Sequence, residues 1–408
     1  MPSDPSFELN SGGLLRALEL LEGRGASGGT STAFPKSLPD LGLGEMEALE
    51  RLAPGVLGRA TYLDAGEAMA HMDPPTPWIT WAVALWNARL NQNLLHPATA
   101  PFAREAEACV VEWLAPFFGM NGGHMTAGSS LANLTALWAA RDLRGVTKVI
   151  ASSASHLSVR KAARILGLEY VEAGTDPRHR LDPATLPGDL SDACLVLTAG
   201  TTSVGAVDPL DVCGRAGWTH VDAAWAGPLA LSGRYRNLLS GVDQADSVAV
   251  SAHKWLFQPK ESALVLFRDT EAAHRTLGFG GTYLAAPNIG VQGSHGAAGT
   301  LLLATLLAWG REGMAARIEH CMDNAGRLQA FITAHPDLEG FPDGGTGVIV
   351  FRPTSRNVEA FSAALPQGLA SQANLNGEAW LRCVSANPNA DMEGILAAID
   401  EAGRRAGA

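Results

Sequence analysis

The sequence predicts an α/β protein with a mostly parallel central sheet, helices on both faces of that sheet, and a small α+β domain at the C-terminal end. Short apolar runs rich in β-branched residues are bounded by turn residues, which is typical of buried parallel strands. Helical patterns separate several of these runs, and such alternation places helices on both faces of a sheet. The predicted strands are Val146–Ala151, Ala193–Thr198, Trp218–Val221, Ser247–Val250 and Ala263–Phe267.

The chain divides into three predicted parts. Residues 1–75 form an N-terminal segment with short helices at Leu14–Glu22 and Met46–Leu57, residues 76–312 form a large domain, and residues 313–408 form a small domain. The proline-rich stretch Asp73–Pro77 cannot be helical, because proline fixes φ and lacks a donor. Gly122-Gly123 predicts a break in the chain. The other predicted elements are helices at Ile79–Leu95, Ala103–Phe118, Leu131–Leu143, His156–Leu166, Gly313–Ala334, Asn357–Ala364 and Met392–Ala406, with strands at Val348–Phe351 and Trp380–Val384.

Composition narrows the class of protein. The 408 residues carry a net charge of −11 and no basic run, which disfavours binding to nucleic acid or to an anionic membrane. The five cysteines are scattered and form no C-x-x-C pair, which suits a reducing cytoplasm. Met1–Asn10 has no signal-peptide pattern, and the longest apolar run, Leu301–Trp309, is too short to span a bilayer and predicts a core helix. Eleven histidines form no close ligand cluster, so we expect no metal site.

A lysine and an aspartate follow two of the predicted strands. Lys254 comes shortly after Ser247–Val250, and Asp222 directly follows Trp218–Val221. A lysine at the end of a buried strand is costly unless its amine loses its charge, and an imine with an aldehyde is one way to do so. A carboxylate against a pyridine nitrogen would keep that nitrogen protonated, so the ring accepts electrons. The pair therefore predicts pyridoxal 5'-phosphate (PLP) bound as a Schiff base to Lys254.

Three further segments are candidates for holding this cofactor. Thr126-Ala127-Gly128-Ser129-Ser130 precedes a helical run, where small residues, hydroxyls and free N–H groups bind phosphate. Thr198-Ala199-Gly200-Thr201-Thr202 offers hydroxyls at another strand end, and His156 could stack on a planar ring. Taken singly, each feature has an ordinary structural explanation as a cap, a turn or a hydrogen-bonded core residue. The functional interpretation depends on their joint order along the chain.

In that order, the sequence resembles the PLP-dependent group II amino-acid decarboxylases, which have the aspartate-aminotransferase fold (fold type I) and include glutamate, diaminobutyrate and aromatic-amino-acid decarboxylases. The resemblance covers roughly residues 70–400 and is most specific around Asp222 and Lys254. The matching segments are Leu90–Leu94, Thr126–Leu134, Ser155–Ser158 with Lys161–Ala163, Thr198–Ala206, His220–Gly227, and Asp246-Ser247 leading to His253-Lys254-Trp255.

The resemblance implies a role for each matching residue. Lys254 would form the Schiff base, Asp222 would pair with the pyridine nitrogen, and His156 would stack on one face of the ring. Ala224 would pack near the opposite face. It also implies a homodimer with the active site at the interface, an amino-acid substrate, and decarboxylation to a primary amine with release of CO2. The residues implied around the phosphate are Ser129, Ser130, Thr202, Ser251 and His253.

The sequence departs from the family pattern where the proton donor is expected. His295-Gly296 replaces an Arg-Arg pair of the family, and in the phosphate segment Leu131 stands where glutamate is common, a difference of little consequence for cofactor binding. The segment after Lys254 is too short for the family's long tyrosine-bearing loop, and its single tyrosine is Tyr283. Tyr283, His156 and His295 are therefore the candidate donors. A PLP aminotransferase, lyase or aldehyde-forming oxidase on the same scaffold stays open, as does a non-catalytic relative, although the intact Asp222–Lys254 pair disfavours the last.

The substrate is weakly specified. Arg382 matches a C-terminal arginine of the family, and it either pairs with a substrate carboxylate or forms a structural ion pair. Trp78, Trp81 and Trp225 either make an aromatic wall or serve packing. The run Asn91-Gln92-Asn93 most resembles the diaminobutyrate and acidic-amino-acid branches.

Overall fold

A computed structural model describes residues 4–24, 36–282 and 284–407 of the chain. The chain forms two compact units, residues 1–62 and residues 63–408. The described part of the first unit contains two α-helices, α1 (Ser11–Glu22) and α2 (Glu45–Val56). The side chain of Asn10 caps α1 by accepting a hydrogen bond from the backbone N–H of Gly13 at 2.9 Å. The residues of the candidate site belong to the second unit.

The second unit is built on a seven-stranded sheet with the order β1-β7-β6-β5-β4-β2-β3. Five of its strands run parallel to one another: β3, β2, β4, β5 and β6. The strand β7 pairs antiparallel with both β6 and β1. The predicted α/β class with a mostly parallel sheet is therefore confirmed. The strands are β1 (Gly122–Thr126), β2 (Lys148–Ser152), β3 (Glu169–Ala173), β4 (Ala193–Thr198), β5 (Trp218–Asp222), β6 (Ser247–Ser251) and β7 (Ala263–Phe267).

The sheet is covered on both faces because its strands are apolar at successive positions. Along β4, Leu195 and Leu197 belong to one core cluster, while Cys194 and Val196 belong to another. Side chains alternate between the two faces of a strand, so an unbroken apolar run fills two cores at once. The first core includes residues of α4 (Pro101–Leu114), and the second includes residues of α5 (Ser129–Arg144), α6 (Leu157–Leu166) and α7 (Thr270–Leu277).

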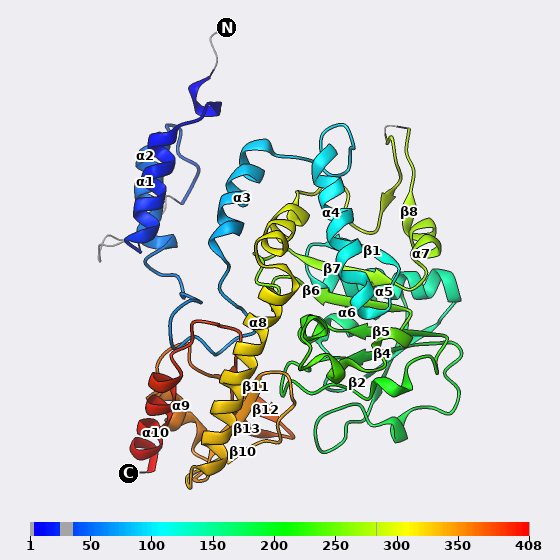
Figure 1. The fold of residues 1–408 in the computed structure, drawn as a ribbon, viewed down its shortest axis with the longest axis vertical. Coiled ribbons are helices and arrows are strands. Elements are labelled where there is room, and N and C mark those ends of the chain that lie inside the picture. The colour runs from blue at the N-terminus through cyan, green and yellow to red at the C-terminus, as the bar shows by residue number, and fades with distance from the viewer. Residues whose placement is uncertain (1–3, 25–35, 283, 408) are drawn as a thin grey trace. The chain divides into compact units, whose positions relative to one another are not determined.

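The C-terminal part contains a second, antiparallel sheet of four strands with the order β10-β11-β13-β12. The helices α9 (Val358–Ala364) and α10 (Met392–Gly407) share a core with this sheet. Figure 1 shows α8 (Ala298–Ala334) running from the region of α3 (Trp78–Leu90) and α4 to the small sheet. The four strands are β10 (Leu338–Gly340), β11 (Val348–Pro353), β12 (Ser371–Leu375) and β13 (Glu378–Val384), and a two-stranded sheet pairs β8 (Gly278–Phe279) with β9 (Asn288–Ile289).

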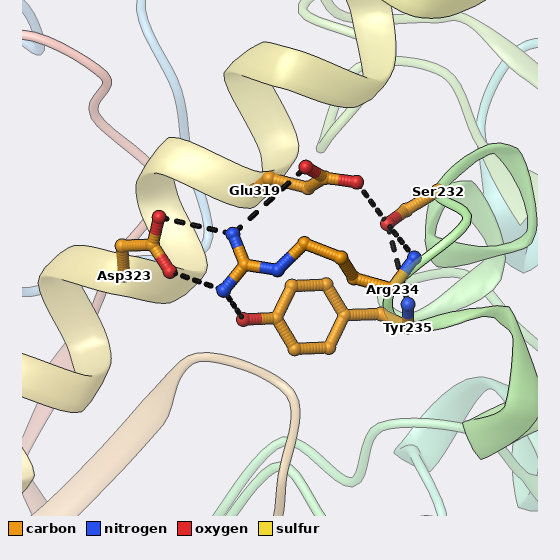
Figure 2. A network of polar contacts seen from close by, with 5 residues as sticks. All are labelled: Ser232, Arg234, Tyr235, Glu319 and Asp323. Atoms are coloured by element: carbon orange, nitrogen blue, oxygen red, sulfur yellow. Dashed lines mark hydrogen bonds and ion pairs between the residues drawn. The ribbon is translucent and has the colours of Figure 1, made fainter.

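A polar network joins α8 to the loop that follows β5 (Figure 2). The Arg234 guanidinium donates to both carboxylate oxygens of Asp323 at 2.7 and 3.1 Å, and also to the Tyr235 hydroxyl at 3.1 Å. The Ser232 hydroxyl donates to Glu319 at 2.5 Å and accepts from the backbone N–H of Arg234 at 3.1 Å. Because Arg234 and Asp323 are both half exposed, the bidentate pair fixes the geometry of this contact more than it adds stability.

Helix α8 contains one residue with non-helical dihedrals. Gly310 has φ 62° and ψ −176°, a conformation that is essentially restricted to glycine. The predicted core helix at Leu301–Trp309 and the predicted helix at Gly313–Ala334 are thus two parts of α8 on either side of this kink. The boundary predicted at residue 312 lies close to it and stays a proposal.

We expect Gly310→Ala to lower the free energy of unfolding by about 1–3 kcal/mol, because alanine must adopt the same strained backbone. No atom lies within 4 Å of the position that a Cβ at Gly310 would take, so steric overlap contributes nothing to this loss. Gly326→Ala is the matched control, since Gly326 lies in the same helix with equally open space. There alanine should stabilise the protein by about 0.5–1 kcal/mol. Equal urea-unfolding curves for the two variants would contradict the prediction.

Two predicted features are corrected by the structure. Helix α3 ends at Leu90, not at residue 95, because Asn91 adopts a left-handed conformation with φ 44°. Gly122-Gly123 does not break the chain but begins β1. The β-strand there was hidden by its glycines, since a Cβ on Gly123 would lie 2.0 Å from the carbonyl oxygen of Val265 in β7. Within the described residues, every helix is too short or too polar to cross a membrane.

Candidate active site

The candidate site lies at the carboxyl ends of β5 and β6, which are parallel neighbours. Asp222 is the last residue of β5 and is paired in register with Ala249 of β6. Ser251 ends β6, and the turn that follows contains His253 and Lys254. Ligands in open α/β sheets bind at this edge, so the topology brings the predicted aspartate and lysine to one place.

The Asp222 carboxylate is buried, with 3% of the residue exposed, and both of its oxygens accept hydrogen bonds. Oδ1 accepts from the backbone N–H of Ala224 at 3.1 Å, and Oδ2 accepts from Nδ2 of Asn133 at 2.8 Å. A carboxylate has about four lone-pair directions, so each oxygen retains capacity for a further donor. Asp222 can therefore receive the N–H of a protonated pyridine ring.

Lys254 is half-buried, and within the described part of the chain its amine has no hydrogen-bond or ion-pair partner. Burial lowers the pKa of the Lys254 ammonium, while the negative charges of Asp222 and Asp73 partly oppose this shift. Asp73 itself forms an ion pair with Lys260. Because the neutral amine is the nucleophilic form, Lys254 is suited to attack an aldehyde.

His156 is the N-cap residue of α6, where its side chain accepts from the backbone N–H of Ser158 at 3.3 Å. Nδ1 also lies 2.8 Å from the Ser158 hydroxyl. Burial lowers the pKa of His156, Asp222 opposes this, and Lys254 adds to it. Hydrogen bonds through Ser158 and Asn133 link His156 to Asp222, so these two residues share one network, and the charge of Lys254 also acts on the imidazole.

The predicted phosphate site forms at the start of α5. Gly128 is the N-cap residue and has φ 104°, and no side chain caps this helix. In the described residues, the backbone N–H groups of Ser129 and Ser130 have no acceptor. The Ser251 hydroxyl lies 3.3 Å from Oγ of Ser129 and 3.3 Å from Nε2 of His253. Free N–H groups at a helix N-terminus, together with hydroxyls, are a suitable anion site.

His253 contributes a neutral imidazole to this cluster. Burial is the main reason that the pKa of His253 falls to about 4. Nδ1 lies 3.0 Å from the carbonyl oxygen of Ser262, which can only accept, so Nδ1 carries the proton and Nε2 faces Ser251 as an acceptor.

The other predicted residues differ in how they relate to the site. Ala224 is buried beside Asp222, whereas the side chains of Ser130 and Thr202 are exposed. The Thr202 carbonyl oxygen accepts from Nη1 of Arg382 at 2.7 Å, and Arg382 is close enough to Lys254 to lower its pKa further. Tyr283 lies outside the described residues.

His295 lies in a different environment from Lys254. It lines a cavity of about 240 Å³ with Glu107 and His124, and Lys254 is not among the lining residues. The Nδ1 atom of His295 contacts the carbonyl oxygen of Gly293 at 2.8 Å. The geometry therefore favours His156 over His295 as the histidine next to Lys254.

The tryptophans do not form a common wall. Trp225 is buried against Trp255, with ring centroids 4.2 Å apart, and its indole N–H donates to the Thr346 carbonyl oxygen at 2.7 Å. Trp78 and Trp81 of α3 are exposed. Trp225 thus serves packing, which was one of the two predicted roles.

Two polar residues at the site had no role in the sequence prediction. Asn133 binds Asp222 directly, and Ser158 binds both Asn133 and His156. Residues i and i+4 lie on one face of a helix, and Asn133 follows Ser129 by four positions. This spacing could have indicated that Asn133 points to the same side of α5 as the phosphate site.

The residues present fit PLP. The aldehyde needs a neutral amine, the pyridine nitrogen needs a carboxylate, and the phosphate needs unpaired N–H groups and hydroxyls. Lys254, Asp222 and the start of α5 supply these three, and each has unused bonding capacity in the described structure.

Comparison with known proteins identifies the family. Residues 66–354 match the family model described as the pyridoxal-dependent decarboxylase conserved domain, which covers more than half of the chain. The chain therefore belongs to the pyridoxal-dependent decarboxylases, and its cofactor is PLP. It is a PLP-dependent amino-acid decarboxylase, a carboxy-lyase by class.

Three relatives illustrate the range of this family. The L-2,4-diaminobutyrate decarboxylase of Rhizobium meliloti (strain 1021) is 29% identical over 416 residues, which cover 90% of this chain and 83% of that protein. The phenylacetaldehyde synthase of Arabidopsis thaliana is 33% identical over 210 residues, covering 43% of each chain. A crystal structure of Oryza sativa TDC with PLP and tryptamine has a TM-score of 0.85 at 21% identity, and the match covers 97% of this chain and 98% of that one.

Proposed function

We propose that this protein removes the α-carboxylate of an L-amino acid as CO2 and releases the matching primary amine. The observation that supports this most strongly is the partnerless amine of Lys254 beside the buried carboxylate of Asp222, on parallel neighbouring strands. We propose that these two groups hold the aldehyde and the pyridine nitrogen of the cofactor. Ser129, Ser130, Thr202, Ser251 and His253 are the proposed phosphate-side residues, and Ala224 and His156 flank the ring.

Bound PLP supplies an electron sink for the electron pair that is released when the bond between Cα and the carboxylate breaks. The protein's own residues prepare this step. Burial lowers the pKa of the Lys254 ammonium, which favours the neutral, nucleophilic amine that would attach the cofactor. Asp222 would hold a proton at the pyridine nitrogen, because its fixed negative charge would stabilise a positive ring. His156, whose pKa responds to the charges of both Asp222 and Lys254, is a proposed proton donor to the reacting carbon, with Tyr283 as the other candidate.

Arg382 is the proposed anchor for a substrate carboxylate. It lies on β13, and its Nη atoms donate to the carbonyl oxygens of Thr202 and Ala70 at 2.7 and 3.2 Å. Its Nε atom is buried without a partner, and the described residues form no ion pair with it. Burial lowers the pKa of Arg382, so a carboxylate would relieve an uncompensated charge. The similarity to the Rhizobium meliloti enzyme supports diaminobutyrate as a first substrate to test, and the similarity to the aspartate 1-decarboxylase of Aliivibrio fischeri supports an acidic amino acid.

The test is a product assay with the PLP-loaded protein. Purified protein is incubated with L-2,4-diaminobutyrate, L-aspartate, L-glutamate and aromatic L-amino acids, while CO2, amine, aldehyde and H2O2 are measured. We expect one substrate class to yield CO2 and amine in equal amounts. A keto acid without CO2 would contradict decarboxylation and indicate transamination.

A specific observation supports a second reaction, the oxidative formation of an aldehyde. In this reaction the amino acid, O2 and water yield aldehyde, CO2, ammonia and H2O2. The hydroxyls of the three described tyrosines form hydrogen bonds away from Lys254. Tyr62 contacts Leu57, Tyr170 contacts Ser155, and Tyr235 contacts Arg234. No described tyrosine is thus available to protonate the substrate carbon at Lys254. Equal amounts of aldehyde and H2O2 without amine would establish this alternative.

We also propose that the protein works as a homodimer. Helix α3 packs on α8 through one side, with Thr80 and Val83 buried, and exposes several large apolar side chains. Exposed apolar patches of this kind are typical of protein interfaces. The exposed residues of α3 are Trp78, Trp81, Leu85, Trp86 and Leu90.

We expect Trp86→Glu to convert the dimer to a monomer, because a buried unpaired carboxylate in an apolar interface is costly. Trp86 is 62% exposed in the single chain. Ile165→Glu on α6 is the control, since Ile165 is 67% exposed but lies on another helix. Sedimentation velocity at micromolar concentration should give twice the 42.6 kDa chain mass for wild type and control, and the chain mass for Trp86→Glu. A monomeric wild-type protein would contradict the proposal.

A further inference from the structure

Asn133 is at the centre of a buried hydrogen-bond network that reaches both Asp222 and His156. Only 1% of Asn133 is exposed. Its Nδ2 donates to Oδ2 of Asp222 at 2.8 Å and to Oγ of Ser158 at 2.9 Å, and its Oδ1 lies 3.0 Å from Nε2 of His220. Every polar atom of the amide is therefore used, as expected for a buried asparagine.

The direction of the hydrogen bonds around Asn133 is fixed by chemistry. A carboxylate only accepts, so the amide nitrogen must face Asp222 and the amide oxygen must face His220. The oxygen accepts from Nε2–H of His220, which leaves Nδ1 of His220 to accept from the Ser247 hydroxyl at 2.9 Å. His220 is fully buried, and burial lowers its pKa to about 4, so it is neutral, as this arrangement requires.

The same reasoning fixes the tautomer of His156. Ser158 Oγ accepts from Asn133, so its single hydrogen is free to point to Nδ1 of His156, 2.8 Å away. The backbone N–H of Ser158 also donates to Nδ1, at 3.3 Å. The backbone contact needs a lone pair on Nδ1, and the hydroxyl hydrogen of Ser158 can point to the same lone pair. The proton of neutral His156 is therefore on Nε2, the nitrogen that points away from Ser158.

We propose that Asn133 is a positioning residue that holds the Asp222 carboxylate in place and, through Ser158, keeps the His156 proton on Nε2. One amide thus orients the group that binds the pyridine nitrogen and sets the donor that faces the reacting carbon. A histidine with its proton on Nδ1 would present a lone pair, not a donor, to that carbon. The inference deepens the proposed function and rests on its assignment of Asp222 and His156.

The tautomer is measured first, on the apoprotein, by NMR of 15N-histidine-labelled protein. The resonances of His156 are those lost in His156→Gln. In wild type we expect an unprotonated Nδ1 and a protonated Nε2. In Ser158→Ala, which removes the hydroxyl but keeps the backbone donor, we expect a mixture of both tautomers. A proton on Nδ1 in wild type, or an unchanged His156 spectrum in Ser158→Ala, would overturn the proposed role of Ser158.

The hold on Asp222 is measured by PLP affinity. Asn133→Leu removes a hydrogen bond to a charged acceptor, and we expect the Kd for PLP to rise about 10-fold or more. Asn324→Leu is the matched control, because Asn324 is an equally buried asparagine on α8 that contacts His320 and not the site. We expect it to leave the Kd and the His156 spectrum unchanged. Wild-type PLP affinity in Asn133→Leu would overturn the positioning role.

Failure of this inference and failure of the proposed function give different results. If the wild-type protein binds no PLP, the proposed function fails, while the apoprotein spectrum still tests the network. If Asn133→Leu does not fold, Asn133→Ser replaces it, since serine retains a small polar side chain that cannot reach Asp222, Ser158 and His220 at once. The same rise in Kd is expected for Asn133→Ser, and a wild-type Kd in that variant counts against the proposal.

Discussion

Lys254→Ala is expected to abolish covalent attachment of PLP and to lower kcat by roughly 10⁴-fold or more, the range found when an enzyme loses its nucleophile. The reason is that the half-buried amine of Lys254 has no partner within the described residues and is close enough to Asp222 to feel its charge. The measurement is the visible absorption band of the purified protein, together with mass spectrometry after borohydride reduction. Wild type should retain the cofactor covalently, and the variant should not.

Lys260→Ala is the matched control for this prediction. Lys260 lies six positions further along the same loop, but it is exposed and paired with Asp73. Its removal should leave the absorption band and the reduced adduct unchanged. Covalent PLP in Lys254→Ala, or its loss in Lys260→Ala, would contradict the assignment.

The same lysine has a stability cost that can be measured without cofactor. Burial lowers the pKa of Lys254, so the unfolded chain binds its proton more tightly than the folded chain. The cost is fully present below the folded-state pKa and disappears as pH rises to the unfolded value near 10.4. We therefore expect apo Lys254→Met to unfold at a higher temperature than apo wild type at neutral pH. The difference should shrink as pH rises, and a constant difference would contradict the stated cause.

The sheet and the juxtaposition of Asp222 and Lys254 could be predicted because they are encoded locally. Apolar runs such as Ala193–Thr198 have one structural solution, a strand that is buried on both faces. Asp222 and Lys254 follow directly on two such runs, so knowing that the strands are parallel was enough to place them together. His156 was equally local, since it begins the helix after a predicted strand.

Other features depend on contacts between distant parts of the chain. Gly123 lies in a strand, although its sequence pattern is that of a turn. Glycine is needed there because the backbone of β7 approaches too closely for any side chain. Asn133 reaches Asp222 across 89 positions, and Arg382 reaches Thr202 across 180. No local pattern distinguishes these residues from ordinary polar ones. Positioning residues of this kind therefore require the structure.

Asp222→Asn is expected to lower kcat by about 10²–10³-fold, the cost of losing one preorganised electrostatic contact in an active site. The side chain keeps its size, but an amide cannot supply the negative charge that keeps the pyridine nitrogen protonated. Nδ2 of Asn133 would also face a neutral group or a second amide nitrogen where it now meets a carboxylate at 2.8 Å. The 15N shift of labelled PLP in the bound state reports directly on protonation of the ring, and should change in this variant.

Asp208→Asn is the control for Asp222→Asn, because it also removes a buried carboxylate but one that lies away from the proposed ring site. Asp208 is 2% exposed and accepts from the backbone N–H groups of Leu181 and Thr198 at 2.6 and 2.7 Å, so its substitution should cost stability. Burial raises the pKa of Asp208 to about 6, yet its contacts are to the backbone and not to the proposed ring site. We expect Asp208→Asn to leave the ring nitrogen shift unchanged. If Asp222→Asn and Asp208→Asn change the 15N shift of the ring nitrogen equally, the charge of Asp222 does not keep that nitrogen protonated. The proposed role of Asp222 would then be wrong.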